Sequence, residues 1–197
     1  MEIDDFESME GGLHLIRLRN FQDGIGEILG ELFQSESSWS HSHRIRGRWE
    51  NTYLDIEKIP SVRPILNLAS QFAGKLHKQP LVSIQGGQGM LKDSFWFNIM
   101  HNGEETGWHN HKARAHTSGV CYLQVPKQSG EFMYRSPCGK LRSLIPETGT
   151  LLLFPSNLNH AVAPSQSSEV RISMAFNLFT LPLELEPEDP FGGNLFY

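Results

Sequence analysis

Residues 151–177, LLLFPSNLNHAVAPSQSSEVRISMAFN, decide the fold that this sequence predicts. The stretch opens with four consecutive apolar residues, which is typical of a short strand buried on both faces. Turn-forming residues then lead to a single histidine, His160. From Val170 to Asn177 apolar and polar residues alternate, which predicts a second strand with one apolar face. Arg171 and Ser173 share the opposite face of that strand.

Short runs of the same kind fill the chain from residue 92 onward. Turns rich in Gly, Pro and Asn separate these runs. Many short strands joined by turns are typical of a β-sandwich or β-barrel rather than of alternating βαβ units. The predicted strands are residues 94–99, 117–125, 131–134, 141–144, 150–154 and 170–179.

The N-terminal part has a different pattern, in which apolar residues recur at helical spacing. It predicts a helix over 20–33, with Asn20 as its N-cap, and a second helix over 65–76. A strand is predicted before them, at 13–18. We expect both helices to pack on the outside of a sheet.

The segment between the two helices carries polar residues without an apolar pattern. Ser35 to Ser42 is predicted to be a solvated loop with His41. His43 follows this loop and is given the same solvated role. The basic cluster Arg44 to Arg48 is interpreted as a solvated face in preference to a contact with an anionic substrate. The residues offered here for a substrate entrance are Trp39, Arg44, Arg46, Arg48 and Trp49.

Length and composition limit the class of protein. A chain of 197 residues is consistent with one all-β domain, here residues 1–91 as support, 92–180 as core and 181–197 as an irregular strap. The formal net charge of -5 argues against a nucleic-acid partner. Two cysteines cannot form a disulfide framework, and no apolar run is long enough to span a membrane. We therefore expect a cytoplasmic protein, and no pattern in the sequence bears on whether it forms a homodimer.

Three histidines and one arginine form a pattern with a chemical interpretation. His109 and His111 lie two residues apart in an extended segment, so their side chains project to one face. His160, from a distant strand, is predicted to complete a set of three metal ligands. Arg171 offers a planar guanidinium that matches a carboxylate, and Ser173 adds a hydroxyl beside it. His77 and His101 are given no part in this site.

This ordered set resembles the 2-oxoglutarate- and Fe(II)-dependent oxygenases, most closely a bacterial and phage-associated subgroup. The resemblance covers about the C-terminal half of the chain, and each motif is specific only as a member of the set. It implies a double-stranded β-helix, or jelly roll, with N-terminal helices packed on one sheet. The residues that carry it are Trp96 to Asn98, His109 to His111, Ser118 to Leu123, Gly149 to Ser156, His160 to Pro164 and Arg171 to Asn177.

The resemblance also implies cofactors and roles. Iron would be held by the three histidines, 2-oxoglutarate would be the co-substrate, and O₂ would oxidise a substrate that the sequence does not identify. Arg171 and Ser173 would bind the far carboxylate of 2-oxoglutarate, and Asn98 and Tyr122 would line its pocket. His111 stands where most of the superfamily has Asp or Glu. A local shift of register would make His116 the ligand instead.

Two rival interpretations remain open. Gly103, five further residues and then His109 to His111 match the start of the cupin pattern, which would give a three-histidine metalloenzyme without 2-oxoglutarate. That pattern expects a glutamate where this chain has His116, and it gives Arg171 no special role. The third interpretation is a non-enzymatic jelly-roll binding module whose histidines are incidental.

Overall fold

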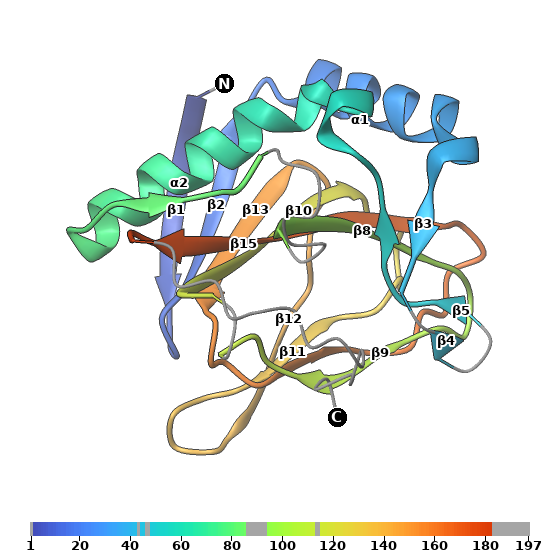
Figure 1. The fold of residues 1–197 in the computed structure, drawn as a ribbon. Helices are drawn as coiled ribbons and strands as arrows, with labels where there is room; N and C mark the ends of the chain where they lie inside the picture. The colour runs from blue at the N-terminus through green and yellow to red at the C-terminus, as the bar shows by residue number, and fades with distance from the viewer. Residues whose placement is uncertain (1, 43, 46–47, 86–93, 113–114, 183–197) are drawn as a thin grey trace, which may run out of the picture.

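Two antiparallel sheets face each other and enclose the space in which the predicted site residues lie (Figure 1). The computed structural model describes residues 2–42, 44–45, 48–85, 94–112 and 115–182. The glycine-rich turn at 86–89, His43, Arg46 and all but the first two residues of the strap at 181–197 lie outside this description. None of the described helices is long and apolar enough to cross a membrane.

The larger sheet has nine strands, and its centre is built from the apolar runs of the C-terminal half. Its order is β1 (Glu2–Met9), β2 (Leu13–Arg19), β13 (Thr150–Pro155), β10 (Thr117–Gln124), β15 (Arg171–Thr180), β8 (Phe95–Met100), β6 (Thr52–Tyr53) and β3 (Ser40–His41), and β7 (Leu81–Val82) pairs with β15. The mainly β architecture that the sequence predicts is therefore confirmed.

The smaller sheet has four strands and supplies the opposite wall. Its order is β12 (Leu141–Leu144), β11 (Phe132–Arg135), β14 (His160–Val162) and β9 (Thr106–His109). A separate hairpin, β4 (Arg44–Ile45) with β5 (Arg48–Trp49), lies outside both sheets. The sequence placed His109 in an extended segment and His160 on a distant strand, but it gave no bounds for β9 and β14, because each has only three or four residues.

Two helices cover the face of the larger sheet that points away from the smaller one (Figure 1). They are α1 (Gln22–Gln34) and α2 (Arg63–His77), and short 3₁₀ turns span Glu36–Ser38, Ile56–Lys58 and Pro60–Val62. Apolar residues of both helices and of the sheet form one buried cluster, each fully buried aliphatic side chain contributing roughly 1.5–3 kcal/mol. The predicted packing of the N-terminal helices on one sheet is thus confirmed.

Two local predictions are wrong, and one strand was missed. Asn20 does not cap α1: it has a φ of 52° in the turn before the helix, and Phe21 is the N-cap without a side-chain hydrogen bond. The acidic residues 2–9, for which no strand was predicted, form edge strand β1 because they pair with the basic residues of β2. The loop with His41 is not fully solvated, since Ser40 and His41 form β3 against β6.

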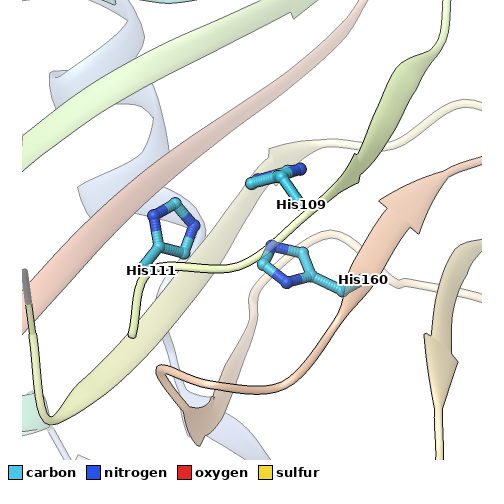
Figure 2. Close-up of side chains that lie close together, drawn as sticks. All are labelled: His109, His111 and His160. Atoms are coloured by element: carbon cyan, nitrogen blue, oxygen red, sulfur yellow. The ribbon is translucent and has the colours of Figure 1, made fainter. Parts of the chain in front are cut away.

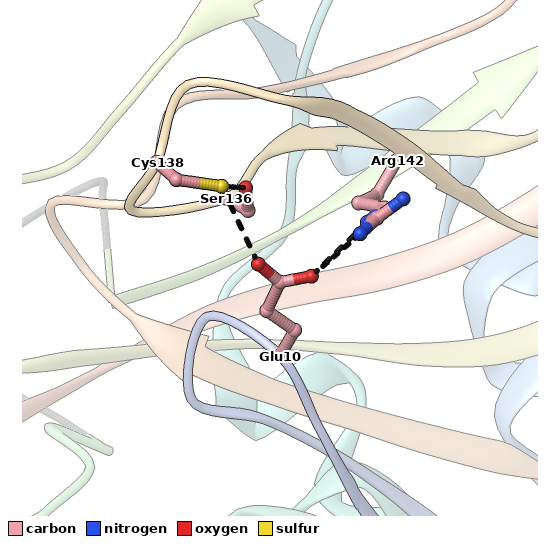
Figure 3. A network of polar contacts seen from close by, with 4 residues as sticks. All are labelled: Glu10, Ser136, Cys138 and Arg142. Atoms are coloured by element: carbon pink, nitrogen blue, oxygen red, sulfur yellow. Dashed lines mark hydrogen bonds and ion pairs between the residues drawn. The ribbon is translucent and has the colours of Figure 1, made fainter.

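A polar network joins the ends of the two sheets (Figure 3). Glu10, in the turn between β1 and β2, accepts hydrogen bonds from Nε and Nη2 of Arg142 on β12 at 3.1 and 3.0 Å. The hydrogen bond from Arg142 is the main reason why the pKa of Glu10 is lowered. Sγ of Cys138 lies 3.7 Å from the same carboxylate and 3.0 Å from Oγ of Ser136. Because Glu10, Cys138 and Arg142 are exposed, we interpret the network as a link between turns.

Strand β15 has the alternation that its sequence predicts. Ile172, Met174 and Phe176 belong to the buried cluster under the helices. Arg171 and Ser173 face the other way, into the space between the sheets, where they line a pocket. The strand therefore supports the core with one face and the site with the other.

Close packing between the central strands predicts a stability effect at Gly119 on β10. A Cβ there would lie 2.3 Å from Cζ of Phe176 and 2.8 Å from Cδ2 of Leu153, distances that require the core to move. We expect Gly119→Ala to lower the free energy of unfolding by about 1–3 kcal/mol in urea denaturation followed by circular dichroism. Gly26→Ala in α1, where a Cβ meets nothing within 4 Å, should instead raise it by about 0.5–1 kcal/mol. Equal effects of the two substitutions would contradict this account.

Candidate metal centre

The pairing of β9 with β14 places two histidines directly opposite each other. His109 ends β9, His160 begins β14, and the two residues are partners in the antiparallel register. His111 follows His109 by two residues, and its backbone N–H donates to the carbonyl of Ser156 at 2.7 Å. Because that bond ties the segment to the turn before β14, all three side chains reach the same place.

The three imidazoles surround a common space (Figure 2). One ring nitrogen from each residue lies within 4.8 Å of the others. The ring centroids are 4.3 Å apart for His109 and His160, 5.0 Å for His109 and His111, and 5.3 Å for His111 and His160. Among the described residues this is the one group of three or more His, Cys, Asp or Glu close enough to hold a metal ion.

Backbone carbonyls fix which nitrogen two of these rings present. Nδ1 of His109 lies 2.8 Å from the carbonyl oxygen of Gly107, and Nδ1 of His160 lies 2.9 Å from that of Leu158. A carbonyl can only accept, so Nδ1 is the protonated nitrogen in both rings. The Nε2 lone pair is then available, and this second hydrogen bond is the arrangement found around metal-bound histidines.

The surroundings keep His160 neutral. Its side chain is 5% exposed, and burial lowers its pKa well below the ordinary value, with further lowering from His109 and His111. The ring stacks on Phe132 at 5.4 Å and meets Phe154 edge-on at 4.7 Å. A neutral imidazole held in an apolar wall is in the protonation state that binds a metal.

Arg171 lies in the same pocket as the three histidines. It is 3% exposed, and its Nη1 donates to the carbonyl oxygens of Ser129 at 3.2 Å and Gly130 at 2.5 Å. Its guanidinium also lies 5.4 Å from the ring centre of Tyr122. Ser173 lines the pocket two residues further along β15.

Tyr122 is fully buried, and it contributes a polar group to this pocket. Its hydroxyl has no hydrogen-bond partner among the described residues, although buried hydroxyls normally have one. Burial raises the pKa of Tyr122 to about 12, against a smaller lowering by Arg171. The hydroxyl is therefore protonated and can donate to a bound anion.

Asn98 also lines the pocket, but its amide hydrogens are already used. Nδ2 of Asn98 donates to the carbonyl oxygen of Glu50 at 2.8 Å and to Oδ1 of Asn51 at 3.0 Å. Glu50 and Asn51 consequently form part of the pocket wall, which the sequence did not predict. Trp96, two residues before Asn98, faces the pocket beside His111, as the alternation of β8 could have shown.

The other histidines lie elsewhere. The nitrogens of His116 contact Nε2 of Gln79 at 2.8 Å and Oγ1 of Thr117 at 2.9 Å, and its ring lies 4.8 Å from that of His77. His101 is exposed. The structure thus places His111, rather than His116, with His109 and His160.

Comparison with known proteins identifies part of the chain that contributes to this site. Residues 133–177 match a family described as "Putative 2OG-Fe(II) oxygenase". This match includes His160, Arg171 and Ser173 but not the His109 to His111 pair. No curated protein matches the chain.

Several solved structures are similar in fold. The non-heme alpha ketoglutarate dependent carbocyclase SnoK from nogalamycin biosynthesis is 13% identical with a TM-score of 0.69, over 87% of this chain and 80% of SnoK. A prolyl-4-hydroxylase from Pseudomonas putida is 16% identical with a TM-score of 0.63, over 87% and 94% of the two chains. HygX from Streptomyces hygroscopicus, solved with nickel and 2-oxoglutarate bound, is 12% identical with a TM-score of 0.63, over 91% and 89%.

At these identities the likeness establishes the fold. The chain has the double-stranded β-helix of the 2-oxoglutarate- and Fe(II)-dependent oxygenases, and its residues 133–177 carry the sequence pattern of that family.

Proposed function

We propose that this protein is a non-haem, Fe(II)- and 2-oxoglutarate-dependent dioxygenase that carries out a hydroxylase-type oxidation. The observation that supports it most is that one pocket contains both the three-histidine cluster and the buried guanidinium of Arg171. A metal site alone would also suit a cupin, but a cupin has no need of an arginine in the same pocket. We further propose that residues 1–197 act as one domain around this site.

The donor set fits iron. Imidazole nitrogen binds Fe, Zn, Cu and Ni, and three protein ligands leave coordination positions open for other molecules. His109, His111 and His160 would hold the ion, two of them through Nε2. Because all three ligands are neutral, the ion would keep its full charge of about +2, which favours an anionic co-ligand.

The rest of the pocket fits a dicarboxylate. Arg171 presents a charged planar donor that remains protonated at every relevant pH. The ring of Tyr122 lies 5.4 Å from this guanidinium in the pocket wall and carries a hydroxyl, and Ser173 adds a second hydroxyl on the same strand face as Arg171. We propose that these three residues bind the carboxylate of 2-oxoglutarate that lies away from the metal.

The chain's own part in the reaction is to bind, orient and exclude water. When bound, iron and 2-oxoglutarate supply the activation of O₂ that oxidises the substrate. Phe132 and Phe154 hold the His160 ring in one orientation and line the pocket with apolar surface. Asn98 fixes the segment at Glu50 and Asn51 on the pocket wall, so its role is to position that wall.

The first prediction concerns the metal. Tag-free protein loaded anaerobically should retain about one Fe(II) per chain, measured by elemental analysis after gel filtration, and His160→Ala should lose it. His116→Ala should retain the metal, since its ring is engaged with Gln79 and Thr117. Circular dichroism would confirm that both variants fold. Equal loss from the two variants would argue against the cluster as the metal site.

The second prediction concerns Arg171. In anaerobic calorimetry of the iron-loaded protein, Arg171→Ala should weaken 2-oxoglutarate binding by about 2–5 kcal/mol, roughly 30-fold or more, because it removes one partner of a buried charge pair. Iron binding should change far less. Arg171→Lys should be intermediate, because it keeps the charge but loses the planar fork.

The control for this substitution is Arg135→Ala, an exposed arginine that stacks on Trp108 at 4.9 Å. It should leave the affinity for 2-oxoglutarate unchanged. 2-Oxoglutarate should also raise the melting temperature of the iron-loaded wild-type protein by mass action. If the iron-loaded wild-type protein neither binds 2-oxoglutarate in calorimetry nor gains melting temperature from it, the cupin interpretation is favoured.

The third prediction uses the buried hydroxyl of Tyr122. Tyr122→Phe removes a hydroxyl without a partner, so the free energy of unfolding of the ligand-free protein should stay unchanged or rise. Its affinity for 2-oxoglutarate should fall roughly 10- to 100-fold, because a hydrogen bond to a charged group is lost. Thermal unfolding and calorimetry measure the two effects. A loss of stability with unchanged affinity would show that the hydroxyl is structural.

A further inference from the structure

A stack of three side chains joins the β4–β5 hairpin to β3, and the proposed reaction gives this stack no role. Arg44 and Trp49 are paired across the hairpin, and the guanidinium of Arg44 lies 4.5 Å from the ring centre of Trp49. The Trp49 ring stacks on the imidazole of His41, with centroids 4.9 Å apart and planes 7° from parallel. Nδ1 of His41 lies 3.3 Å from Oγ1 of Thr52 on β6, which ties the stack to the larger sheet.

Hydrogen bonds attach the base of this hairpin to the pocket wall. The backbone N–H of Ser42 donates to the carbonyl of Asn51 at 3.1 Å, and the N–H of Asn51 donates to Oγ of Ser42 at 3.0 Å. Asn51 and Glu50 both line the pocket, where Asn98 holds them. Arg44 is two residues beyond Ser42, so the Cα atoms of the two residues are at most about 7 Å apart.

Arg44 is exposed, and its guanidinium makes no hydrogen bond or ion pair with any described residue. The stack on Trp49 restricts its side chain while leaving its N–H groups at the edge of the guanidinium. An arginine held in this way binds an oxyanion with less loss of side-chain entropy than a freely moving one. The hairpin sequence contains three arginines, at 44, 46 and 48, in a chain whose formal net charge is -5.

We propose that Arg44, held on Trp49, is an oxyanion-binding residue at the rim of the pocket, and that the substrate carries a phosphate or carboxylate group there. This inference rests on the proposed oxygenase function, because it assigns the substrate class of the same pocket. The part of the substrate that is oxidised enters between the sheets, and its anionic group stays outside, on the hairpin. The group would be a planar or tetrahedral oxyanion, which a guanidinium binds through two parallel N–H groups.

Nuclear magnetic resonance can test this with inorganic phosphate and acetate as probes. The metal-free protein, without 2-oxoglutarate, is titrated at constant ionic strength maintained with sodium chloride, and the Nε–H of Arg44 and the indole N–H of Trp49 are followed. Both signals should shift in a saturable way with at least one of the probes. The comparison of the two probes shows whether the site prefers phosphate or carboxylate.

Three variants make the test specific. Arg44→Ala should abolish the saturable shift at the Trp49 indole, and Arg44→Lys should raise the midpoint at least fivefold, because lysine lacks the fork. Arg135→Ala, which removes a second described arginine stacked on a tryptophan, should leave that midpoint unchanged. The proposal is overturned if a titration with sodium chloride alone gives the same shifts, if the Trp49 shift persists in Arg44→Ala, or if equal shifts occur at Arg135 and Trp108.

Binding of 2-oxoglutarate distinguishes a failure of this inference from a failure of the proposed function. Arg44→Ala should bind iron and 2-oxoglutarate as the wild-type protein does, because Arg44 lies outside the set that includes Arg171 and Tyr122. If the wild-type protein binds 2-oxoglutarate and shows no anion response at Arg44, the rim site is wrong and the oxygenase proposal stands. If it responds at Arg44 and does not bind 2-oxoglutarate, the oxyanion site stands and the substrate role assigned to it is withdrawn.

Discussion

The register between β9 and β14 is the constraint on which the site depends. It sets His109 opposite His160, and a slip of one residue would turn one of the two side chains to the outside of the barrel. The same strands belong to the smaller sheet, whose Phe132 stacks on the His160 ring, while Phe154 of the larger sheet contacts the ring edge-on. The fold therefore fixes the ring positions through backbone pairing, which is a stiffer restraint than contacts between side chains on loops.

The absence of a carboxylate from the described cluster changes the charge of the site. A metal held by three neutral imidazoles keeps more positive charge than one held by two imidazoles and a carboxylate. Arg171, in the same pocket, adds a further positive charge. Such a pocket selects a dianionic ligand more strongly than the usual ligand set would, and it disfavours a cationic substrate group close to the metal.

Strands with their own alternation of apolar and polar residues could be predicted from the sequence. Strands and contacts that depend on a partner distant in the chain were missed. The alternation along β15 was enough to separate Ile172, Met174 and Phe176 from Arg171 and Ser173. Strand β1 was missed because an acidic edge strand has no apolar face and is explained only by its partner β2. Glu50 and Asn51 could not be assigned to the pocket, because Asn98 brings them there across more than 45 residues of sequence.

The polar groups buried in the pocket wall are best explained by a ligand. A guanidinium that is 3% exposed carries a desolvation cost, part of which the hydrogen bonds to the carbonyls of Ser129 and Gly130 offset. The Tyr122 ring centre lies 5.4 Å from that guanidinium, and its buried hydroxyl has no hydrogen-bond partner in the described part of the chain. Apolar side chains at both positions would pack between the sheets at less cost, so stability alone does not account for these residues. A bound carboxylate within reach of both groups would pair with the guanidinium and accept a hydrogen bond from the hydroxyl. Strands β9 and β14 of the opposite sheet, with the residues that follow β9, place the three imidazoles in the same pocket.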